Sequence, residues 1–212
     1  MLTTDRSLLF ISMSPRSSAS VAEKTRNGIV EAAVNQASVE GLESVTFGRL
    51  AGQLEMSKAG VVGPFGNKEQ LQLEAFRAAM EMFRRDVWDP AAEVERGLPR
   101  LEAICENWLD HLTGDTFPGG CFLTQTAAEF DGREGPVRDA IKGSSILWEK
   151  VLASEVKVAV KKGQMPKGTD PAQVAFELDA IAQGTNQAIQ LRNESDARQR
   201  GHRAMRRVLG LN

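Results

Sequence analysis

Residues that build metal and disulfide sites are scarce in this sequence. Its 212 residues include two cysteines, Cys105 and Cys121, and two histidines, His111 and His202. Neither cysteine has a partner at metal-ligand spacing, and so few cysteines indicate a reducing compartment rather than a disulfide framework. A histidine-built metal site is nearly excluded for the same reason. We therefore expect a cytoplasmic protein that holds no metal and no cofactor.

Long apolar runs and strand patterns are also lacking. No segment approaches the ~18 consecutive apolar residues that span a membrane, so no membrane partner is expected. There is no tyrosine, and no run alternates apolar and polar residues between turn residues. The formal net charge of −2 offers no broad attraction for nucleic acid or anionic lipid. Any binding to DNA would therefore need a local arrangement of donors.

Helical periodicity fills most of the remaining chain, which predicts an all-α protein of roughly nine helices. The first 21 residues are Ser-rich, with a short apolar run preceded by one positive charge. This composition favours a disordered leader over a signal peptide. The first helix is expected to begin at about Glu23, just after that leader.

Three short helices follow in quick succession. The first ends at Gly41, which supplies a C-terminal stop. Thr46 can cap the second helix and Ser57 the third, because their side-chain oxygens can accept from free backbone N–H groups. Such a trihelical unit can lay its third helix in the major groove while the second touches the DNA backbone. The sequence thus predicts a helix-turn-helix head.

Longer helices make up the rest of the chain. Asn67 can cap a fourth helix that is expected to end near Pro90. Pro136 and Asp170 open two further long helices, with a proline in the first turn of each. Between the fourth helix and Pro136 lies the clearest amphipathic pattern, with apolar residues at i, i+3, i+4, i+7, i+8 and i+11. Those residues are Leu101, Ile104, Cys105, Trp108, Leu109 and Leu112.

These patterns divide the chain into three parts. A leader covers residues 1–21, a predicted helix-turn-helix head residues 22–70, and a longer helical domain residues 71–212. The side chains expected to contact DNA lie at the start of the second helix and along the third. They are Thr46, Arg49, Ser57, Lys58, Ala59, Val61, Val62 and Lys68.

Several motifs between residues 24 and 76 are specific. They are Ile29, Ala32-Ala33, Gly41, Val45-Thr46, Leu50-Ala51, Met56-Ser57-Lys58, Phe65, Asn67-Lys68-Glu69 and Leu71. With these residues the head resembles the tetracycline-repressor (TetR) family of one-component regulators. Farther along, GGCF at 119–122, EFD at 129–131 and GPVRDAI at 135–141 resemble one branch of the family. The resemblance implies a homodimeric repressor that binds operator DNA and releases it when a small apolar ligand binds.

The head departs from the family pattern at three positions. Glu55 stands where a glycine is common, in a left-handed turn that costs a non-glycine residue about 1–2 kcal/mol. Val62 and Pro64 replace an aromatic residue and a His or Tyr that commonly contact DNA. Pro64 lacks an N–H and would clash one turn back, so the third helix is expected to end at about Val62. Gly63, which precedes the proline, is biased toward extended geometry.

The charge of the head raises an alternative function. Residues 22–70 hold five basic and six acidic residues, a local sum of −1, whereas phosphate contacts normally supply much of the affinity for DNA. The alternative is a ligand-binding or interaction dimer of the same fold that has lost sequence-specific DNA binding. The shortening of the third helix need not abolish binding, because recognition helices use mainly their N-terminal residues. A working but shortened DNA reader is therefore the favoured interpretation.

The resemblance implies a small-molecule pocket between the fourth and seventh helices. Apolar walls with a few polar groups suit such a cavity. The residues proposed to line it are Phe83, Trp88, Trp108, His111, Phe122, Gln125, Thr126 and Trp148. The alternative for each of them is a place in the hydrophobic core.

The resemblance also implies a dimer interface on the last two helices. Ala180, Gly184 and Ala188 recur at i, i+4 and i+8, a spacing that would let a partner helix approach closely. Phe176 and Ile181 add apolar area beside that strip. An intramolecular packing face is the alternative.

Two interpretations of Cys121 stay open. It follows two glycines at an expected helix N-terminus, where a thiolate is favoured and could serve a redox sensor. A buried structural cysteine is the other interpretation, and Cys105 lies on an apolar face. An enzyme is not expected, because the sequence has no nucleophile–base arrangement, phosphate-binding glycine loop or metal constellation.

Overall fold

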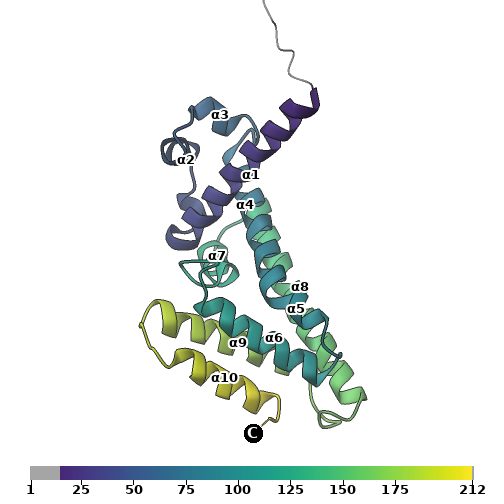
Figure 1. Ribbon diagram of the computed structural model, residues 1–212. Helices are drawn as coiled ribbons and strands as arrows, with labels where there is room; N and C mark the ends of the chain where they lie inside the picture. The colour runs from purple at the N-terminus through teal and green to yellow at the C-terminus, as the bar shows by residue number, and fades with distance from the viewer. Residues whose placement is uncertain (1–14, 212) are drawn as a thin grey trace, which may run out of the picture.

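The computed structural model describes residues 15–211, and every regular element among them is helical (Figure 1). This confirms the all-α fold. The elements are α1 (Pro15–Glu40), η1 (Leu42–Ser44), α2 (Phe47–Gln53), α3 (Lys58–Val62), α4 (Lys68–Phe83), η2 (Arg84–Trp88), α5 (Asp89–Ala92), α6 (Leu98–Thr113), α7 (Phe122–Phe130), α8 (Pro136–Lys161), α9 (Pro171–Gln190) and α10 (Ala197–Val208). A π-helical turn, η2, joins α4 and α5 into one continuous rod. None of the described helices is long and apolar enough to cross a membrane.

Helix α1 begins at Pro15, eight residues before the expected start at Glu23. The later part of the expected disordered leader, residues 15–21, is therefore helical, while residues 1–14 lie outside the described residues. A proline is well placed at the first position of a helix, because the N–H that it lacks has no partner there. The serines after it gave no periodic apolar signal, which explains why the earlier start was missed.

Local capping signals in the head are confirmed by the structure. The Thr46 hydroxyl accepts from the Arg49 N–H at 3.4 Å, and the Ser57 hydroxyl accepts from the Gly60 N–H at 3.1 Å. Each bond satisfies one of the backbone donors that a helix start leaves free. The Asn67 side chain caps α4 in the same way, at 2.9 Å from the Gln70 N–H.

The end of α3 is as expected from Pro64. The helix stops at Val62, whose carbonyl accepts from the N–H groups of Phe65 and Gly66 at 3.0 and 2.8 Å. Gly63 differs from expectation, since its φ of −48° and ψ of −48° are helical rather than extended. The turn therefore closes tightly before the proline, and the buried Phe65 anchors the connection to α4.

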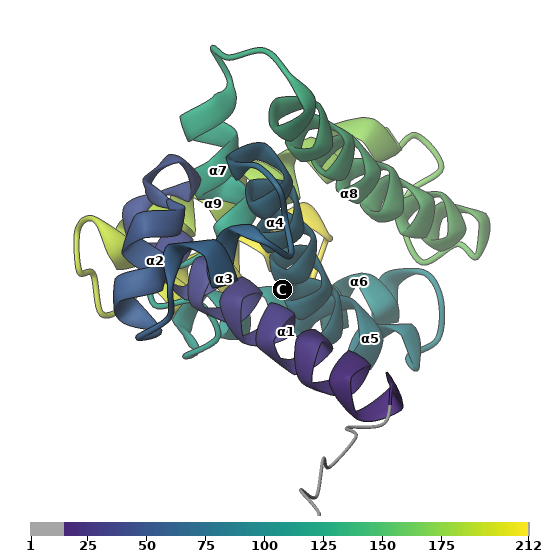
Figure 2. The same ribbon diagram turned by 90° about the horizontal axis from the view of Figure 1, so that it is seen from above.

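The head and the body share one hydrophobic core at their junction. Residues of α1, α2 and α3 pack against α4 and α7, with Phe76 and Phe122 fully buried between them. Seen from above, the three head helices gather over the end of α4, and α8 lies on the other side of α4 from α2 (Figure 2). Head and body are therefore continuous in packing as well as in sequence.

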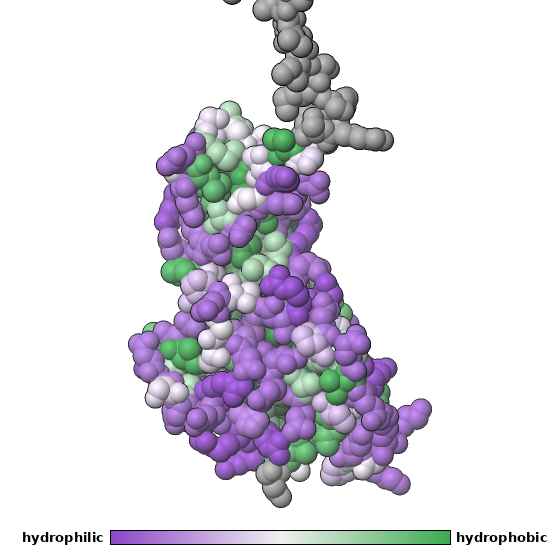
Figure 3. Space-filling view, viewed as in Figure 1, coloured by the Kyte–Doolittle hydropathy of each residue, from purple (hydrophilic) through white to green (hydrophobic). Residues whose placement is uncertain are grey.

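A second core fills the part of the body farthest from the head. The predicted apolar face of α6 is buried there against α8, α9 and α10. Helices α9 and α10 lie side by side at the end of the molecule opposite the head (Figure 1). The face seen in Figure 3 is mainly hydrophilic, with smaller apolar patches on the head and the lower body.

Candidate DNA-binding surface and ligand cavity

Helices α2 and α3 form the predicted helix-turn-helix. They cross closely, with Leu50 and Val61 fully buried and Ala51 nearly so. Between them Glu55 has a φ of +53°, in the left-handed region, as the sequence predicted from its place in the turn. The Met56 N–H donates to the Ala51 carbonyl at 2.9 Å, which closes this turn.

Replacing Glu55 with glycine is expected to raise the free energy of unfolding by up to about 1.5 kcal/mol. Relief of the left-handed strain is worth about 1–2 kcal/mol, and the greater freedom of glycine in the unfolded chain offsets roughly 0.5–1 kcal/mol of it. Urea unfolding measures the change. Asn193→Gly is the matched control, because Asn193 shares the φ of +53° but asparagine tolerates this region. A Glu55→Gly variant less stable than the parent would contradict the strain argument.

The exposed start of α3 is the surface available to DNA. Ser57, Lys58 and Ala59 are exposed, and Val62 is half-buried at the helix end. At the start of α2, Arg49 is exposed and Thr46 half-buried. Val61 was wrongly placed among the contacts: its side chain is fully buried, because one face of so short a helix must pack on α2.

Most basic side chains of the head are already paired with carboxylates. Arg49 donates to Glu40 at 2.8 Å, and Arg26 lies 3.1 Å from Glu74. The Lys68 ammonium donates to the Glu43 carboxylate at 2.6 Å, and this hydrogen bond lowers the pKa of Glu43. Lys68 was expected to contact DNA, but its bonds direct it to Glu43 rather than to solvent.

Lys58 differs from these ion-paired basic side chains. Of the five lysine and arginine residues between positions 22 and 70, Lys24 and Lys58 form no ion pair with a residue that the structure describes. Lys58 is the first residue of α3, beside the Ser57 cap. Lys58 is therefore an exposed cation at the start of α3 that no described carboxylate pairs.

A cavity of about 430 Å³ lies in the body between the α4–η2 rod, α7 and α8. Its walls are mainly apolar and aromatic, which suits a small ligand. Three of the predicted residues, Phe83, Trp88 and Trp148, line it. The full lining is Met80, Glu81, Phe83, Arg84, Trp88, Leu123, Ser144, Leu147, Trp148 and Val151.

The α8 wall of the cavity was missed by the sequence prediction except for Trp148. Ser144, Leu147, Trp148 and Val151 stand at i, i+3, i+4 and i+7, a helical face that could have revealed it. Leu147 lies at the rim of the cavity and is 62% exposed, which is high for a large apolar side chain. Beside it, the Arg84 guanidinium donates to Glu81 at 2.9 Å, so the rim carries a paired rather than a free charge.

The other predicted ligand residues lie behind the walls or elsewhere in the core. Trp108 meets Phe83 and Trp148 edge-on, with ring centroids 6.0 and 5.2 Å apart, and so supports the aromatic wall from behind. Phe122 packs instead on Phe76 and Phe117 in the core below the head. Neither lines the cavity, because helix packing turned these faces inward.

Three polar residues proposed to orient a ligand make internal bonds. The Thr126 hydroxyl donates to the Phe122 carbonyl at 2.9 Å, and the Gln125 amide donates to the Gly119 carbonyl at 2.8 Å. The Nδ1 of His111 lies 3.2 Å from the carboxylate of Asp86 on η2. Burial lowers the pKa of His111, which favours a neutral ring at pH 7. These side chains fix the scaffold around the cavity.

The family model for the tetracyclin repressor-like C-terminal domain matches residues 97–205. This match covers just over half of the 212 residues. The chain belongs to the TetR family of transcriptional regulators. The matched segment lies in the body, whereas the sequence resemblance rested mainly on the head. Both parts of the chain therefore indicate the same family.

Solved structures of transcriptional regulators share the fold of this TetR-family chain. A TetR transcriptional regulator from Chloroflexus aurantiacus J-10-FL superposes with a TM-score of 0.81 at 19% identity, over 90% of this chain and 95% of that one. The regulator CifR, in a cysteine mutant complexed with 26-bp operator DNA, gives 0.71 at 20% identity over 87% and 95%. A putative transcriptional regulator from Saccharomonospora viridis, in complex with choline, gives 0.76 at 19% identity over 90% and 97%. No curated protein sequence matches the chain.

The predicted dimer strip of this TetR-family protein lies mostly on the outer face of α9. Phe176 is 61% exposed, Ala180 and Gly184 are exposed, and Ile181 is half-buried. Ala188 is buried, and it lines a groove between α9 and α10 together with Ile181 and Gly184. Leu191, just after α9 and outside the predicted strip, is 76% exposed.

Both cysteines of the TetR-family body are buried. Cys121 is the N-cap residue of α7, yet burial raises the pKa of its thiol. Burial also raises the pKa of Cys105, to about 12. Desolvation therefore outweighs the helix N-terminus at Cys121, which favours the structural interpretation over a redox sensor.

Proposed function

We propose that this TetR-family regulator is a repressor that binds operator DNA as a homodimer and releases it when a small molecule occupies the cavity in its body. The observation that carries the proposal is the exposed start of α3. There Ser57 caps the helix, and Lys58 is exposed and forms no ion pair with any residue that the structure describes. Recognition helices read DNA mainly with such N-terminal residues.

Loss of DNA reading is not favoured as the function. Glu55 adopts the conformation that the turn requires, and Pro64 shortens α3 only after its exposed first residues. The same fold carries operator DNA in the CifR structure. Most basic side chains of the head are paired with carboxylates, which favours only weak attraction to DNA of arbitrary sequence. A complex with operator DNA would therefore depend on a few specific contacts.

A two-fold dimer would supply the second head that an operator with two half-sites needs. The outer face of α9 supports this part of the proposal, because Phe176 and Leu191 expose apolar area beside the small residues Ala180 and Gly184. Small residues let two helices approach closely, and the large ones add buried area.

The ligand we propose is small and largely apolar. The cavity of about 430 Å³ is walled by Phe83, Trp88 and Trp148, and its nearest charges, Glu81 and Arg84, neutralise each other. An apolar molecule would gain from burial against these rings without leaving a charge unpaired. The choline complex of the Saccharomonospora viridis regulator supports small-molecule binding by this fold.

Selection of DNA fragments from a random pool, followed by affinity measurements from low to physiological salt, tests the function. Lys58→Gln is expected to weaken binding to the selected DNA and to reduce the slope of log K against log salt by about 1 for each head. Lys157→Gln, which removes an exposed charge from α8, is the control and should change neither quantity. Failure of the parent protein to enrich any sequence would refute the DNA-binding proposal. An unchanged slope in Lys58→Gln would refute the assignment of Lys58.

A further inference from the structure

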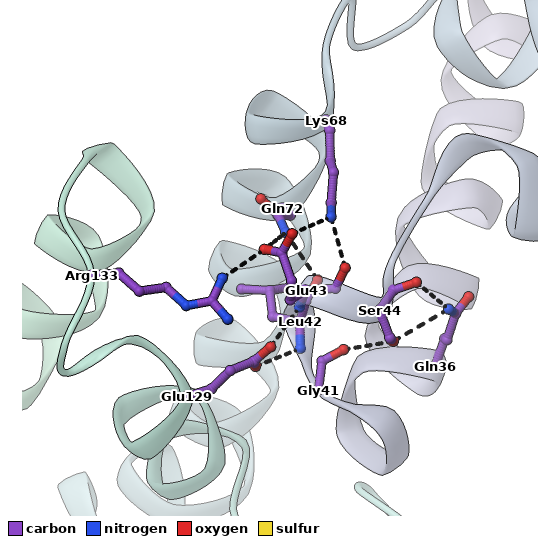
Figure 4. Close-up of polar contacts among 9 residues, drawn as sticks. All are labelled: Gln36, Gly41, Leu42, Glu43, Ser44, Lys68, Gln72, Glu129 and Arg133. Atoms are coloured by element: carbon purple, nitrogen blue, oxygen red, sulfur yellow. Dashed lines mark hydrogen bonds and ion pairs between the residues drawn. The ribbon is translucent and has the colours of Figure 1, made fainter.

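The polar contacts between the head and α7 converge on η1, the short turn that leads from α1 into α2 (Figure 4). The Glu129 carboxylate of α7 accepts two hydrogen bonds there. One oxygen accepts from the Leu42 N–H and the other from the Glu43 N–H, each at 2.7 Å. We call this pair of bonds the Glu129 clamp. Two charge-assisted bonds from one carboxylate fix both the position and the orientation of the turn.

The backbone of the turn is shaped to admit this carboxylate. Gly41 has a φ of +86°, and a Cβ at that position would lie 3.1 Å from the Glu129 carboxyl group. A side chain at Gly41 would therefore be strained and would also crowd Glu129. The glycine that ends α1 thus has a second role that its sequence position did not reveal.

Other side chains hold the same turn from two more directions. Glu43 lies 3.0 Å from the guanidinium of Arg133, just beyond α7, and accepts from Lys68 of α4 (Figure 4). Gln72 of α4 donates to the Leu42 carbonyl at 3.0 Å. Because η1 runs straight into the fully buried Val45 and then α2, its orientation determines that of α2 and α3.

The clamp and the cavity share one helix. Leu123, six residues before Glu129 on α7, lines the cavity and packs against both hydrophobic cores. At nine residues, α7 is too short to bend appreciably between them. A displacement of Leu123 therefore moves Glu129 as well.

We propose that Glu129 is a positioning residue, through which α7 sets the orientation of α2 and α3 relative to the body. A molecule that presses on Leu123 from the cavity reaches the DNA-binding helices by this route. The use of this coupling in regulation rests on the proposed function, but the clamp can be tested without DNA or a ligand.

Hydrogen exchange of the full-length protein tests the clamp itself. In Glu129→Ala, exchange at the Leu42 and Glu43 amides should accelerate by about 10- to 100-fold, the effect of losing hydrogen bonds to a charged acceptor. Glu129→Gln keeps one acceptor oxygen, so its exchange rates at the two amides should lie between those of the parent and those of Glu129→Ala. This variant replaces the alanine variant in the test if the alanine variant does not fold. Glu134→Gln removes a nearby exposed carboxylate and should leave both amides unchanged. Unchanged exchange in both Glu129 variants would overturn the clamp.

Distance measurements test whether the clamp orients the head. Spin labels at Gln53→Cys on α2 and Lys157→Cys on α8 occupy exposed positions, and the native cysteines are buried. Labelled protein mixed with excess unlabelled protein should give a narrow distance distribution that broadens in Glu129→Ala. Leu123→Trp, which fills part of the cavity, should shift the distance when Glu129 is present but not in the Glu129→Ala background. An equal shift in both backgrounds would overturn the coupling.

Affinities for operator DNAs with different half-site spacings distinguish a positioning role of Glu129 from a merely structural one. With DNA selected by the parent protein, one extra base pair between the half-sites should cost the parent much more affinity than Glu129→Ala, because a loosened head tolerates the wrong spacing. A structural role alone would weaken both DNAs by the same factor. If the parent selects no DNA, the proposed function fails, while the exchange and distance results still decide the clamp.

Discussion

Gly119→Ala is expected to lower the free energy of unfolding by about 3 kcal/mol or more, at the upper end of overpacking effects. A Cβ at this position would lie 1.5 Å from the Ser38 carbonyl oxygen and 2.5 Å from its carbon. Ser38 is fully buried near the end of α1, so its backbone cannot retreat without moving the head. The methyl group must therefore separate the turn before α7 from α1. Urea unfolding followed by far-UV circular dichroism measures the loss.

Gly132→Ala is the matched control for this substitution. Gly132 lies just past the other end of α7, and a Cβ there would meet nothing within 4 Å. A substitution at such an exposed site is expected to change stability by no more than about 0.5 kcal/mol. If Gly119→Ala were as stable as Gly132→Ala, α1 and the turn before α7 would not be in the close contact described.

Trp148→Ala is expected to lower the free energy of unfolding by about 3–5 kcal/mol, the usual cost of truncating a buried tryptophan. The Trp148 ring is 8% exposed and meets Phe83 and Trp108 edge-on, with centroids 5.0 and 5.2 Å apart. Its removal leaves two aromatic rings facing an enlarged cavity. Urea unfolding gives the loss, and near-UV circular dichroism reports the disordering of the remaining rings.

Trp88→Ala is the control for Trp148→Ala, because it removes a tryptophan from the cavity wall that is less deeply buried. Trp88 lines the same cavity but is half-buried, and the Arg100 guanidinium lies over its ring, 5.8 Å from the centroid. Its truncation should cost less than half as much as that of Trp148, because water already reaches part of the ring. Equal losses would show that the two tryptophans are buried to the same extent in solution.

Local signals predicted much of the fold. Thr46, Ser57 and Asn67 cap the helices that they were expected to open, and Asp170 accepts from the Ala172 N–H at 2.9 Å at the start of α9. Pro64 ends α3 at Val62. Each of these features depends on residues within about one helical turn, which is why one sequence suffices to find them.

The candidate site was harder to predict, because tertiary packing decides which face of a helix is buried. Val61 and Ala59 are both in α3, but only Val61 faces α2. Ala188 continues the spacing of Ala180 and Gly184, but Ala188 is buried whereas the other two are exposed. Phe122 and Trp148 are equally apolar in the sequence, yet only Trp148 lines the cavity.

Glu129 had no local signal for its role. It lies 87 residues from Leu42, and a carboxylate on a short helix reads as a solvated charge until the fold brings it to η1. Long-range contacts of this kind follow from the packing of α7 on α1. A single sequence carries no spacing rule for them.

The core that crosses the boundary between head and body limits how this regulator can be re-engineered. DNA specificity is most simply exchanged by joining the first helices of one relative to the remainder of another at residue 70. Here such a chimera would keep Glu129 and the Gly119 turn from one parent, while Gly41 and Ser38 came from the other. An exchange that preserves both contacts must transplant residues 117–133 together with the head that carries α2 and α3. The part of the chain that must be exchanged to change DNA specificity is therefore discontinuous in sequence.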